Sequence, residues 1–161
     1  MTHTPVPTPD TFKKLIGAIT GRIAGRALDA QLEQELNTSF PADGPDVRAV
    51  LDACQAGIAA GWMCSREAGG IRFGRVIRPG AETHGFSVDV VDMQPVAGPH
   101  HRHPNGEIDL ILPLEAGARF DGRGIGWLVY GPDSAHRPTV TQGRALVLYL
   151  LPAGAIEFTN T

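Results

Sequence analysis

The spacing of apolar residues along the chain changes once, near Gly69, and this change divides the sequence into two parts. Before Gly69 apolar positions recur roughly every three to four residues, which is the period of an amphipathic helix. After Gly69 apolar and polar positions alternate, which is the period of a strand with one buried face. The pattern therefore predicts a helical segment over residues 10–62 and a β domain over residues 63–161, with strands between about residues 70 and 158.

Three helices are expected in the first part, and each follows a polar residue that can cap its first turn. These residues are Asp10, Asp29 and Asp46. Gly61 is suited to end the third helix, because glycine tolerates the left-handed conformation found at helix C-termini. Residues 1–9 contain three prolines, and we expect them to form a disordered leader.

Five strands are expected in the second part, each bounded by glycine or proline. They cover residues 71–77, 86–92, 108–112, 126–130 and 145–151. Short, evenly spaced strands separated by turn residues are typical of a sandwich or a small barrel. We therefore expect an α+β protein, mainly β, in which a barrel follows an N-terminal helical extension.

Composition narrows the class of protein without identifying its function. A hydrophobic content of 42% and a charged content of 19% are those of an ordinary globular domain, and 161 residues suffice for one buried core. The net charge of −3 and the lack of a basic run argue against a nucleic-acid partner. Neither a signal peptide nor a run of 18 apolar residues is found, so we expect a cytoplasmic protein that does not bind membranes. Cys54 and Cys64 are not expected to form a disulfide, and Cys64 is expected to be a small buried group.

Candidate chemistry is concentrated in residues 99–107 and at His136, where four of the six histidines lie. On an extended strand His101 and His103 project to the same face, because the side-chain period is 2. A turn-forming Asn-Gly pair then lets the chain bring Glu107 back towards that face. Two imidazoles, a carboxylate and a distant third imidazole form a ligand set suited to a divalent first-row metal.

These residues resemble the two conserved motifs of the cupins. His101-x-His103-x-x-x-Glu107 resembles the core of the first motif, and the segment from Gly131 to His136 resembles the second. The resemblance implies a double-stranded β-helix barrel in which His101, His103, Glu107 and His136 bind a divalent ion such as Fe, Mn or Zn. A metal-free pocket that binds substrate directly through these residues is the alternative. His100 cannot share the strand face of His101, and we expect it at the surface or behind the ligands.

Strand alternation extends the candidate site beyond the four ligands. If Glu107 faces inward, Asp109 and Ile111 share its face, and three residues face the opposite layer: Ile108, Leu110 and Leu112. Asp109 is then a second inward carboxylate, able either to act with Glu107 in acid–base catalysis or to orient a histidine ring.

Aromatic and cationic residues supply candidates for substrate binding. Trp127, Tyr130 and Tyr149 lie on expected strands, where each can stack on a planar ligand or belong to the core. An arginine facing the pocket can hold a carboxylate in a bidentate pair, and the sequence does not choose among the arginines that flank the strands. These are Arg72, Arg75, Arg78, Arg119, Arg123, Arg137 and Arg144.

Longer segments resemble the 4-hydroxylaminobenzoate lyases of bacterial nitroaromatic degradation. The similar segments are residues 85–93, 98–111 and 144–152, together with Gly61-Trp62-x-Cys64. The resemblance implies a carbon–nitrogen lyase that converts 4-hydroxylaminobenzoate and water to 3,4-dihydroxybenzoate and ammonia. It also implies a small aromatic acid as substrate.

Two other classes of function remain open at the level of sequence. One is a metal-dependent cupin dioxygenase or isomerase that acts on a small aromatic or sugar acid. The other is a non-enzymatic cupin that binds a small molecule and uses its helices as a dimer contact. Whichever of the three functions applies, we expect a homodimer or a higher homo-oligomer.

Overall fold

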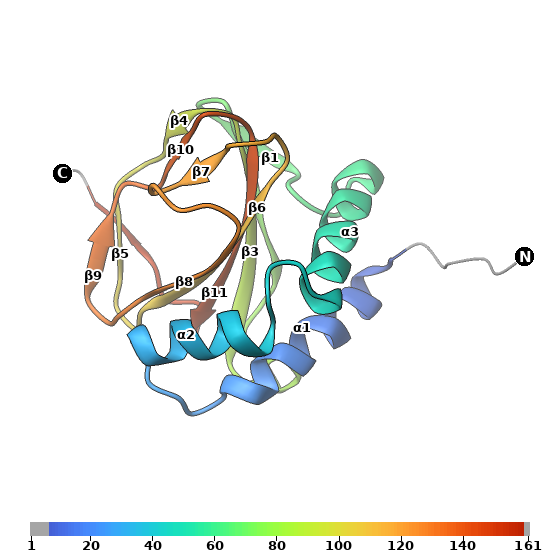
Figure 1. The fold of residues 1–161 in the computed structure, drawn as a ribbon, viewed down its shortest axis with the longest axis vertical. Helices are drawn as coiled ribbons and strands as arrows, with labels where there is room; N and C mark the ends of the chain where they lie inside the picture. The colour runs from blue at the N-terminus through green and yellow to red at the C-terminus, as the bar shows by residue number, and fades with distance from the viewer. Residues whose placement is uncertain (1–6, 160–161) are drawn as a thin grey trace, which may run out of the picture.

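A computed structural model describes residues 7–159, in which a helical segment precedes a β-barrel (Figure 1). Within these residues the helical elements are α1 (Pro9–Ile23), α2 (Ala30–Ser39), α3 (Pro45–Ala60) and a short 3-10 helix, η1 (Ala81–Thr83). No helix in this part of the chain is long and apolar enough to cross a membrane. Most of the expected leader, residues 1–6, lies outside the described residues.

The first helix begins earlier than its sequence pattern predicts. Thr8, and not Asp10, is the N-cap, because its hydroxyl accepts a hydrogen bond from the backbone N–H of Thr11 at 3.2 Å. The Thr11 hydroxyl oxygen accepts in return from the Thr8 N–H at 2.8 Å, which completes a capping box. Pro9 occupies the first helical position, where its missing N–H costs nothing. The end of the predicted leader therefore belongs to α1.

The other helix ends lie close to their predicted positions. Asp29 caps α2 by accepting from the N–H of Leu32 at 2.9 Å. α3 begins at Pro45 after Gly44, so Asp46 lies in its first turn and not at its cap. Gly61 ends α3 with a φ of +88°, in the left-handed conformation that favours glycine.

The β domain contains the five predicted strands and several shorter ones. The five are β2 (Ile71–Ile77), β3 (Phe86–Met93), β6 (Glu107–Pro113), β8 (Gly126–Tyr130) and β11 (Ala145–Pro152). The shorter ones are β1 (Arg66–Ala68), β4 (Val96–Ala97), β5 (His101–His103), β7 (Arg119–Phe120), β9 (Ser134–His136), β10 (Thr139–Thr141) and β12 (Glu157–Phe158).

These strands form a cupin-like barrel. An antiparallel sheet of six strands has the order β1-β2-β3-β11-β6-β8, and two sheets of three strands have the orders β4-β10-β7 and β12-β5-β9. Figure 1 shows the two small sheets curving round the side of the large sheet that faces away from the helices. The predicted fold class, mainly β with an N-terminal helical extension, is confirmed.

Alternate residues of the central strands contribute to two different cores. One core lies between the helices and the outer face of the large sheet, and it includes Ile16, Leu32, Val50, Ile108, Leu110, Leu112, Leu146, Leu148 and Leu150. The other fills the barrel interior and includes Ile111, Phe120, Val147, Tyr149 and Leu151. As the alternation of β6 predicts, Ile108 and Ile111 therefore belong to opposite faces. Burial of both faces explains the nearly continuous apolar runs of β6 and β11.

The second helix covers the edge of the large sheet at β8. The side-chain amide of Asn37 accepts from the Trp127 N–H at 3.0 Å and donates to the Trp127 carbonyl at 3.1 Å. A carboxylate oxygen of Glu33 accepts from the N–H of Val129 at 2.9 Å. These bonds satisfy backbone groups that an edge strand otherwise exposes. They also anchor the strand that ends at Tyr130, beside the candidate site.

Candidate metal centre

The four candidate ligands converge inside the barrel. His101 and His103 lie on β5, His136 lies opposite His101 on β9, and Glu107 begins β6. Their ligand atoms all lie within 4.8 Å of one another. His101, His103 and Glu107 are each at most 2% exposed.

A tight turn brings Glu107 to the histidines. Gly106 has a φ of +88°, and a Cβ there would lie 2.7 Å from both the Leu28 side chain and the Tyr130 carbonyl. The N–H of Gly106 donates to the His103 carbonyl at 3.2 Å. A residue with a side chain would be strained at this position and would clash. The predicted role of the Asn-Gly pair is therefore visible in the turn itself.

Glu107 lies at the middle of the cluster. Its Oε1 lies 3.3 Å from Nε2 of His103 and 3.5 Å from Nε2 of His101. Its Oε2 lies 3.5 Å from Nε2 of His136. The Nε2 atoms of His101 and His136 are 3.1 Å apart.

Two side chains behind the cluster determine which ring nitrogen faces it. The Nδ1 of His136 donates to Oδ2 of Asp121 at 2.6 Å. The Nδ1 of His103 lies 2.9 Å from the Ser134 hydroxyl, which itself donates to the Gly131 carbonyl at 2.6 Å and so accepts from the imidazole. With Nδ1 held by a hydrogen bond in both rings, Nε2 is the nitrogen that faces the centre, and it is the atom that would bind a metal in place of a proton.

The unpaired atoms of the cluster fit a divalent cation. Within the described residues, Nε2 of His103 and both carboxylate oxygens of Glu107 are buried without a hydrogen-bond partner. Buried polar atoms of this kind are costly unless something satisfies them. Ligand atoms about 2.0–2.2 Å from one ion lie roughly 3.0–3.5 Å apart in octahedral or tetrahedral geometry. Four of the separations among these side chains, from 3.1 to 3.5 Å, agree with that requirement.

The pKa values of the cluster show that its carboxylates and imidazoles stabilise each other's charged forms. Burial raises the pKa of Glu107, but the three surrounding imidazoles outweigh it and hold the pKa well below its usual range. Burial lowers the pKa of His136, but its bond to Asp121 and the nearby Glu107 carboxylate raise it to about 9. Burial also raises the pKa of Asp121, and hydrogen bonds from His136, Tyr130 and Thr139 outweigh that effect. Asp121 is therefore a carboxylate that supports positive charge at His136.

Asp121 was not among the residues singled out from the sequence. It follows β7, at a φ of +50°, and its sequence signal is only that of an Asp-Gly turn. Its carboxylate accepts from the Tyr130 hydroxyl at 2.5 Å and from the Thr139 N–H at 2.9 Å, in addition to His136. Ser134 likewise gave no signal beyond its place in the second motif. The roles of Asp121 and Ser134 both depend on which loops the barrel fold places next to the ligand histidines.

Asp109 lies inside the barrel, as the alternation of β6 predicts. It is fully buried between its cross-strand neighbours Leu128 and Tyr149. Neither of its carboxyl oxygens has a hydrogen-bond partner in the described part of the chain. It therefore orients no histidine ring, and Asp121 and Ser134 do so instead. Burial and the charge of Glu107 raise the pKa of Asp109 well above its usual range, which favours its neutral, protonated form.

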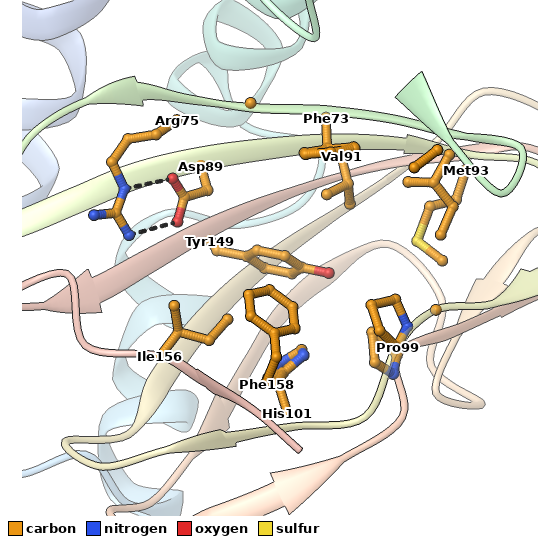
Figure 2. Close-up of a pocket in the computed structure, with 15 residues that line it drawn as sticks. Phe73, Arg75, Asp89, Val91, Met93, Pro99, His101, Tyr149, Ile156 and Phe158 are labelled. Atoms are coloured by element: carbon orange, nitrogen blue, oxygen red, sulfur yellow. Dashed lines mark hydrogen bonds and ion pairs between the residues drawn. The ribbon is translucent and has the colours of Figure 1, made fainter. Parts of the chain in front are cut away.

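A cavity of about 340 Å³ adjoins the cluster (Figure 2). His101 is the candidate ligand that lines it, and Tyr149 forms part of its wall. The ring of His101 lies at 60° to Tyr149 with centroids 6.5 Å apart, and at 70° to Phe158 with centroids 5.9 Å apart. The remaining wall is mostly apolar, which suits a planar ring. Its apolar residues include Ile71, Phe73, Val91, Met93, Pro99, Pro138 and Ile156.

The three aromatic candidates for substrate binding lie in three different places. Tyr149 lines the cavity, whereas Tyr130 packs on the His136 ring with centroids 4.5 Å apart and hydrogen-bonds Asp121. Trp127 faces the helices, where its indole N–H donates to the Phe40 carbonyl at 3.0 Å. The assignment of Trp127 to the substrate site is therefore wrong. Residues three apart on a strand point to opposite faces, so Trp127 and Tyr130 cannot line one pocket.

His100 and the cysteines lie outside the cluster. A ring nitrogen of His100 bonds to the hydroxyl of Thr159 near the C-terminus, consistent with its opposite strand face. Cys54 and Cys64 are free and buried. The thiol of Cys64 donates to the Val90 carbonyl at 3.4 Å, and burial raises its pKa to about 12. Cys64 is thus a poor nucleophile.

The Asp121→Asn variant is expected to weaken metal binding about 10–100-fold, because carboxylates that orient a ligand histidine contribute about that much. The amide can still accept one hydrogen bond but no longer supports positive charge on the imidazole of His136. Titration of the apoprotein with Zn²⁺ or Mn²⁺ measures the change. Asp133→Asn is the matched control, since Asp133 is an exposed aspartate close in sequence whose side chain pairs with Arg102, and its one contact with a ligand residue is a backbone hydrogen bond to the His103 carbonyl that the substitution keeps. Equal metal affinity in both variants would contradict this role for Asp121.

Comparison with known proteins gives one consistent family. The family model for 4-hydroxylaminobenzoate lyase (PnbB) matches residues 14–158. A 4-hydroxylaminobenzoate lyase of Pseudomonas putida is 30% identical over 154 residues, covering 85% of this chain and 88% of the relative. A 4-hydroxylaminobenzoate lyase of Nocardioides sp. (strain LMS-CY) is 31% identical over 167 residues, covering 98% and 96%.

Similarity to solved structures is weaker. An RmlC-like cupin protein from Ralstonia eutropha JMP134 has a TM-score of 0.44 and 8% identity, covering 60% of this chain and 64% of that one. An oxalate oxidase in complex with the substrate analogue glycolate has a TM-score of 0.43 and 21% identity, covering 59% and 58%. Likeness at this level carries no information about ligand or reaction.

Proposed function

Because this chain belongs to the 4-hydroxylaminobenzoate lyase (PnbB) family, we propose that it converts 4-hydroxylaminobenzoate and water to 3,4-dihydroxybenzoate and ammonia. The reaction breaks the N–O and C–N bonds and forms two C–O bonds on the ring. The nitrogen is reduced while a ring carbon is oxidised, so the conversion needs no external oxidant. The water lost from the hydroxylamine and the two waters added to the ring leave a net consumption of one water.

The observation that best supports this proposal is the position of the His101 ring. It belongs to the buried ligand cluster and also lines an apolar cavity large enough for one substituted benzene ring. His101, His103, Glu107 and His136 would hold a divalent ion, which supplies a Lewis acid and lowers the pKa of bound water. A ring in the cavity therefore has its reacting end beside polar groups and its faces against apolar ones.

The reaction requires a proton at the N–OH oxygen so that water can leave. Asp109 is the group best suited to supply it, because it is buried, its pKa is raised by burial and by Glu107, and it lies on the same strand face as Glu107. Asp109 does not line the cavity, so this role requires a water that relays its proton to the substrate. Water then adds at the ring carbon ortho to nitrogen, and the imine that results hydrolyses to release ammonia. The apolar wall limits competing attack by bulk water at other ring positions.

The experiment that tests the proposal is anaerobic turnover. Purified protein given 4-hydroxylaminobenzoate without oxygen is expected to release ammonia and 3,4-dihydroxybenzoate in equal amounts. A strict requirement for oxygen would assign the protein to the dioxygenase alternative. A product that keeps its nitrogen would also contradict the proposal, because the C–N bond must break.

A further inference from the structure

The cavity beside the ligand cluster contains one charged pair besides His101. Arg75 on β2 and Asp89 on β3 are cross-strand neighbours, and both line the cavity among mainly apolar residues. Tyr149 lies opposite Asp89 on the adjoining strand, and its ring lies between the pair and the rings of Phe158 and His101 (Figure 2). The cavity thus has a polar group at His101 and another at Arg75, with an apolar wall between them.

Arg75 is held in place by two partners but keeps unused donors. Its Nε donates to Oδ1 of Asp89 at 2.8 Å, and its Nη2 donates to Oδ2 of Asp89 at 3.2 Å and to the Gly154 carbonyl at 3.1 Å. Within the described residues no hydrogen bond uses Nη1, so its two N–H groups are available. The Arg75 side chain is 36% exposed, which makes it accessible to a ligand.

The space for this guanidinium depends on Gly154. A Cβ at Gly154 would lie 2.8 Å from Nη1 of Arg75, and the glycine has a φ of +68°. The loop after β11 therefore adopts a conformation that favours glycine at the point where the guanidinium packs against it. Asp89 fixes the guanidinium from the other side, so the position of its free edge is set before any ligand arrives.

The other arginines near the strands do not compete for this role. Among the described residues, Arg75 is the one arginine that lines the cavity. Arg72 is exposed and lies on the opposite face of β2. Arg144 is paired with Asp92 at 2.6 and 2.8 Å outside the cavity. The sequence does not identify which arginine faces the pocket, and the fold identifies it as Arg75.

We propose that Arg75 recognises the carboxylate of an aromatic acid whose ring occupies the cavity, and thereby directs the opposite end of the ring towards His101. This inference rests on the proposed function for the identity of the reacting group, but the recognition of an arylcarboxylate can be tested without turnover. Charge favours this orientation. The carboxylates of Glu107 and Asp121 would repel a carboxylate near the cluster, whereas the unused N–H groups of Arg75 can donate to one at the other side of the cavity.

The test compares two probes that differ in charge, benzoate and benzamide, by calorimetric titration of the metal-loaded protein. In Arg75→Gln the affinity for benzoate is expected to fall about 10–100-fold, the usual contribution of hydrogen bonds to a charged group. The affinity for benzamide is expected to change less than about threefold, because the neutral amide gains little from the guanidinium.

Two further variants separate recognition from structural support. Asp89→Asn breaks the same ion pair but keeps the cation, so it is expected to bind benzoate at least as well as the unchanged protein. Arg72→Gln is the matched control for loss of an arginine on β2, and it is expected to leave both affinities unchanged. Thermal unfolding of each variant shows whether the fold is retained.

Equal loss of benzoate and benzamide binding in Arg75→Gln, or unchanged benzoate binding, would overturn the inference. Loss of benzoate affinity in Asp89→Asn as large as in Arg75→Gln would also overturn it, since the pair would then act only as structural support. These outcomes leave the proposed function intact if the protein still turns over 4-hydroxylaminobenzoate. Conversely, selective benzoate binding without lyase activity would support recognition by Arg75 while contradicting the proposed reaction.

Discussion

Replacing His103 with alanine is expected to abolish both the binding of a divalent metal and the proposed lyase activity. His103 is fully buried, its Nε2 lies 3.3 Å from Glu107, and its Nδ1 is fixed by Ser134. The loss of one of four ligands should weaken metal binding by more than about 100-fold, since replacing a residue that only hydrogen-bonds to a ligand already lowers metal affinity about 10–100-fold. Elemental analysis of the purified variant and an activity assay with added metal measure the two effects.

The fold of the variant should survive, because a histidine that serves a metal site adds little to the apolar cores. His84→Ala is a suitable control, since His84 pairs with Thr20 beside α1 and lies outside the ligand cluster. His136→Ala should behave as His103→Ala does. Full metal retention in both ligand variants would contradict the assignment of the centre. A metal-free native protein with full activity would favour the alternative in which these side chains bind substrate directly.

Strand periodicity predicted the part of the site that depends on local geometry. His101 and His103 share a face because they are two apart on one strand, and Glu107 and Asp109 share a face for the same reason. The Asn-Gly pair predicted the turn that joins the two strands. These features involve residues close in sequence, so a one-dimensional pattern suffices to relate them.

The same periodicity shows that Trp127 and Tyr130 cannot both line the cavity. Trp127 is three positions before Tyr130 on β8, so one of the two had to face the helices. The structure places Trp127 against Phe40, with ring centroids 6.4 Å apart. The helical layer is therefore what buries this side chain, and no substrate is needed to explain it.

Other features depend on contacts between segments that are distant in sequence. Asp121 reaches His136 because β7 and β10 are paired, and Arg75 enters the cavity wall because β2 and β3 are paired. No local pattern distinguishes Asp121 from an ordinary turn aspartate or Arg75 from the other arginines. The start of the first helix was also not predictable from residue type alone, since Asp10 and Thr8 are both good N-cap residues. The reciprocal hydrogen bonds between Thr8 and Thr11 make Thr8 the N-cap.

Asp109→Asn is expected to lower turnover about 10²–10⁴-fold while metal content is retained. Asparagine has nearly the same volume and causes no large loss of packing, but it cannot release a proton to the departing hydroxylamine oxygen. Because Asp109 holds none of the histidine rings in the described residues, and Asp121 and Ser134 do so instead, the substitution should leave the rings in place. Steady-state kinetics and elemental analysis of the same preparation measure both quantities.

The pH dependence of turnover provides a second test of the same role. The pKa of Asp109 is raised well above its usual range by burial and by the charge of Glu107, which extends the protonated, acid form to higher pH. Turnover by the native protein should therefore fall as pH rises through that pKa, and this alkaline limb should be absent from Asp109→Asn. A fall of about 10–100-fold in metal affinity in place of turnover would mean that Asp109 supports the ion and not the proton transfer. If neither quantity changes, the buried acid takes no part in catalysis, and the proton must come from a group that lines the cavity, of which Tyr149 is the first to examine.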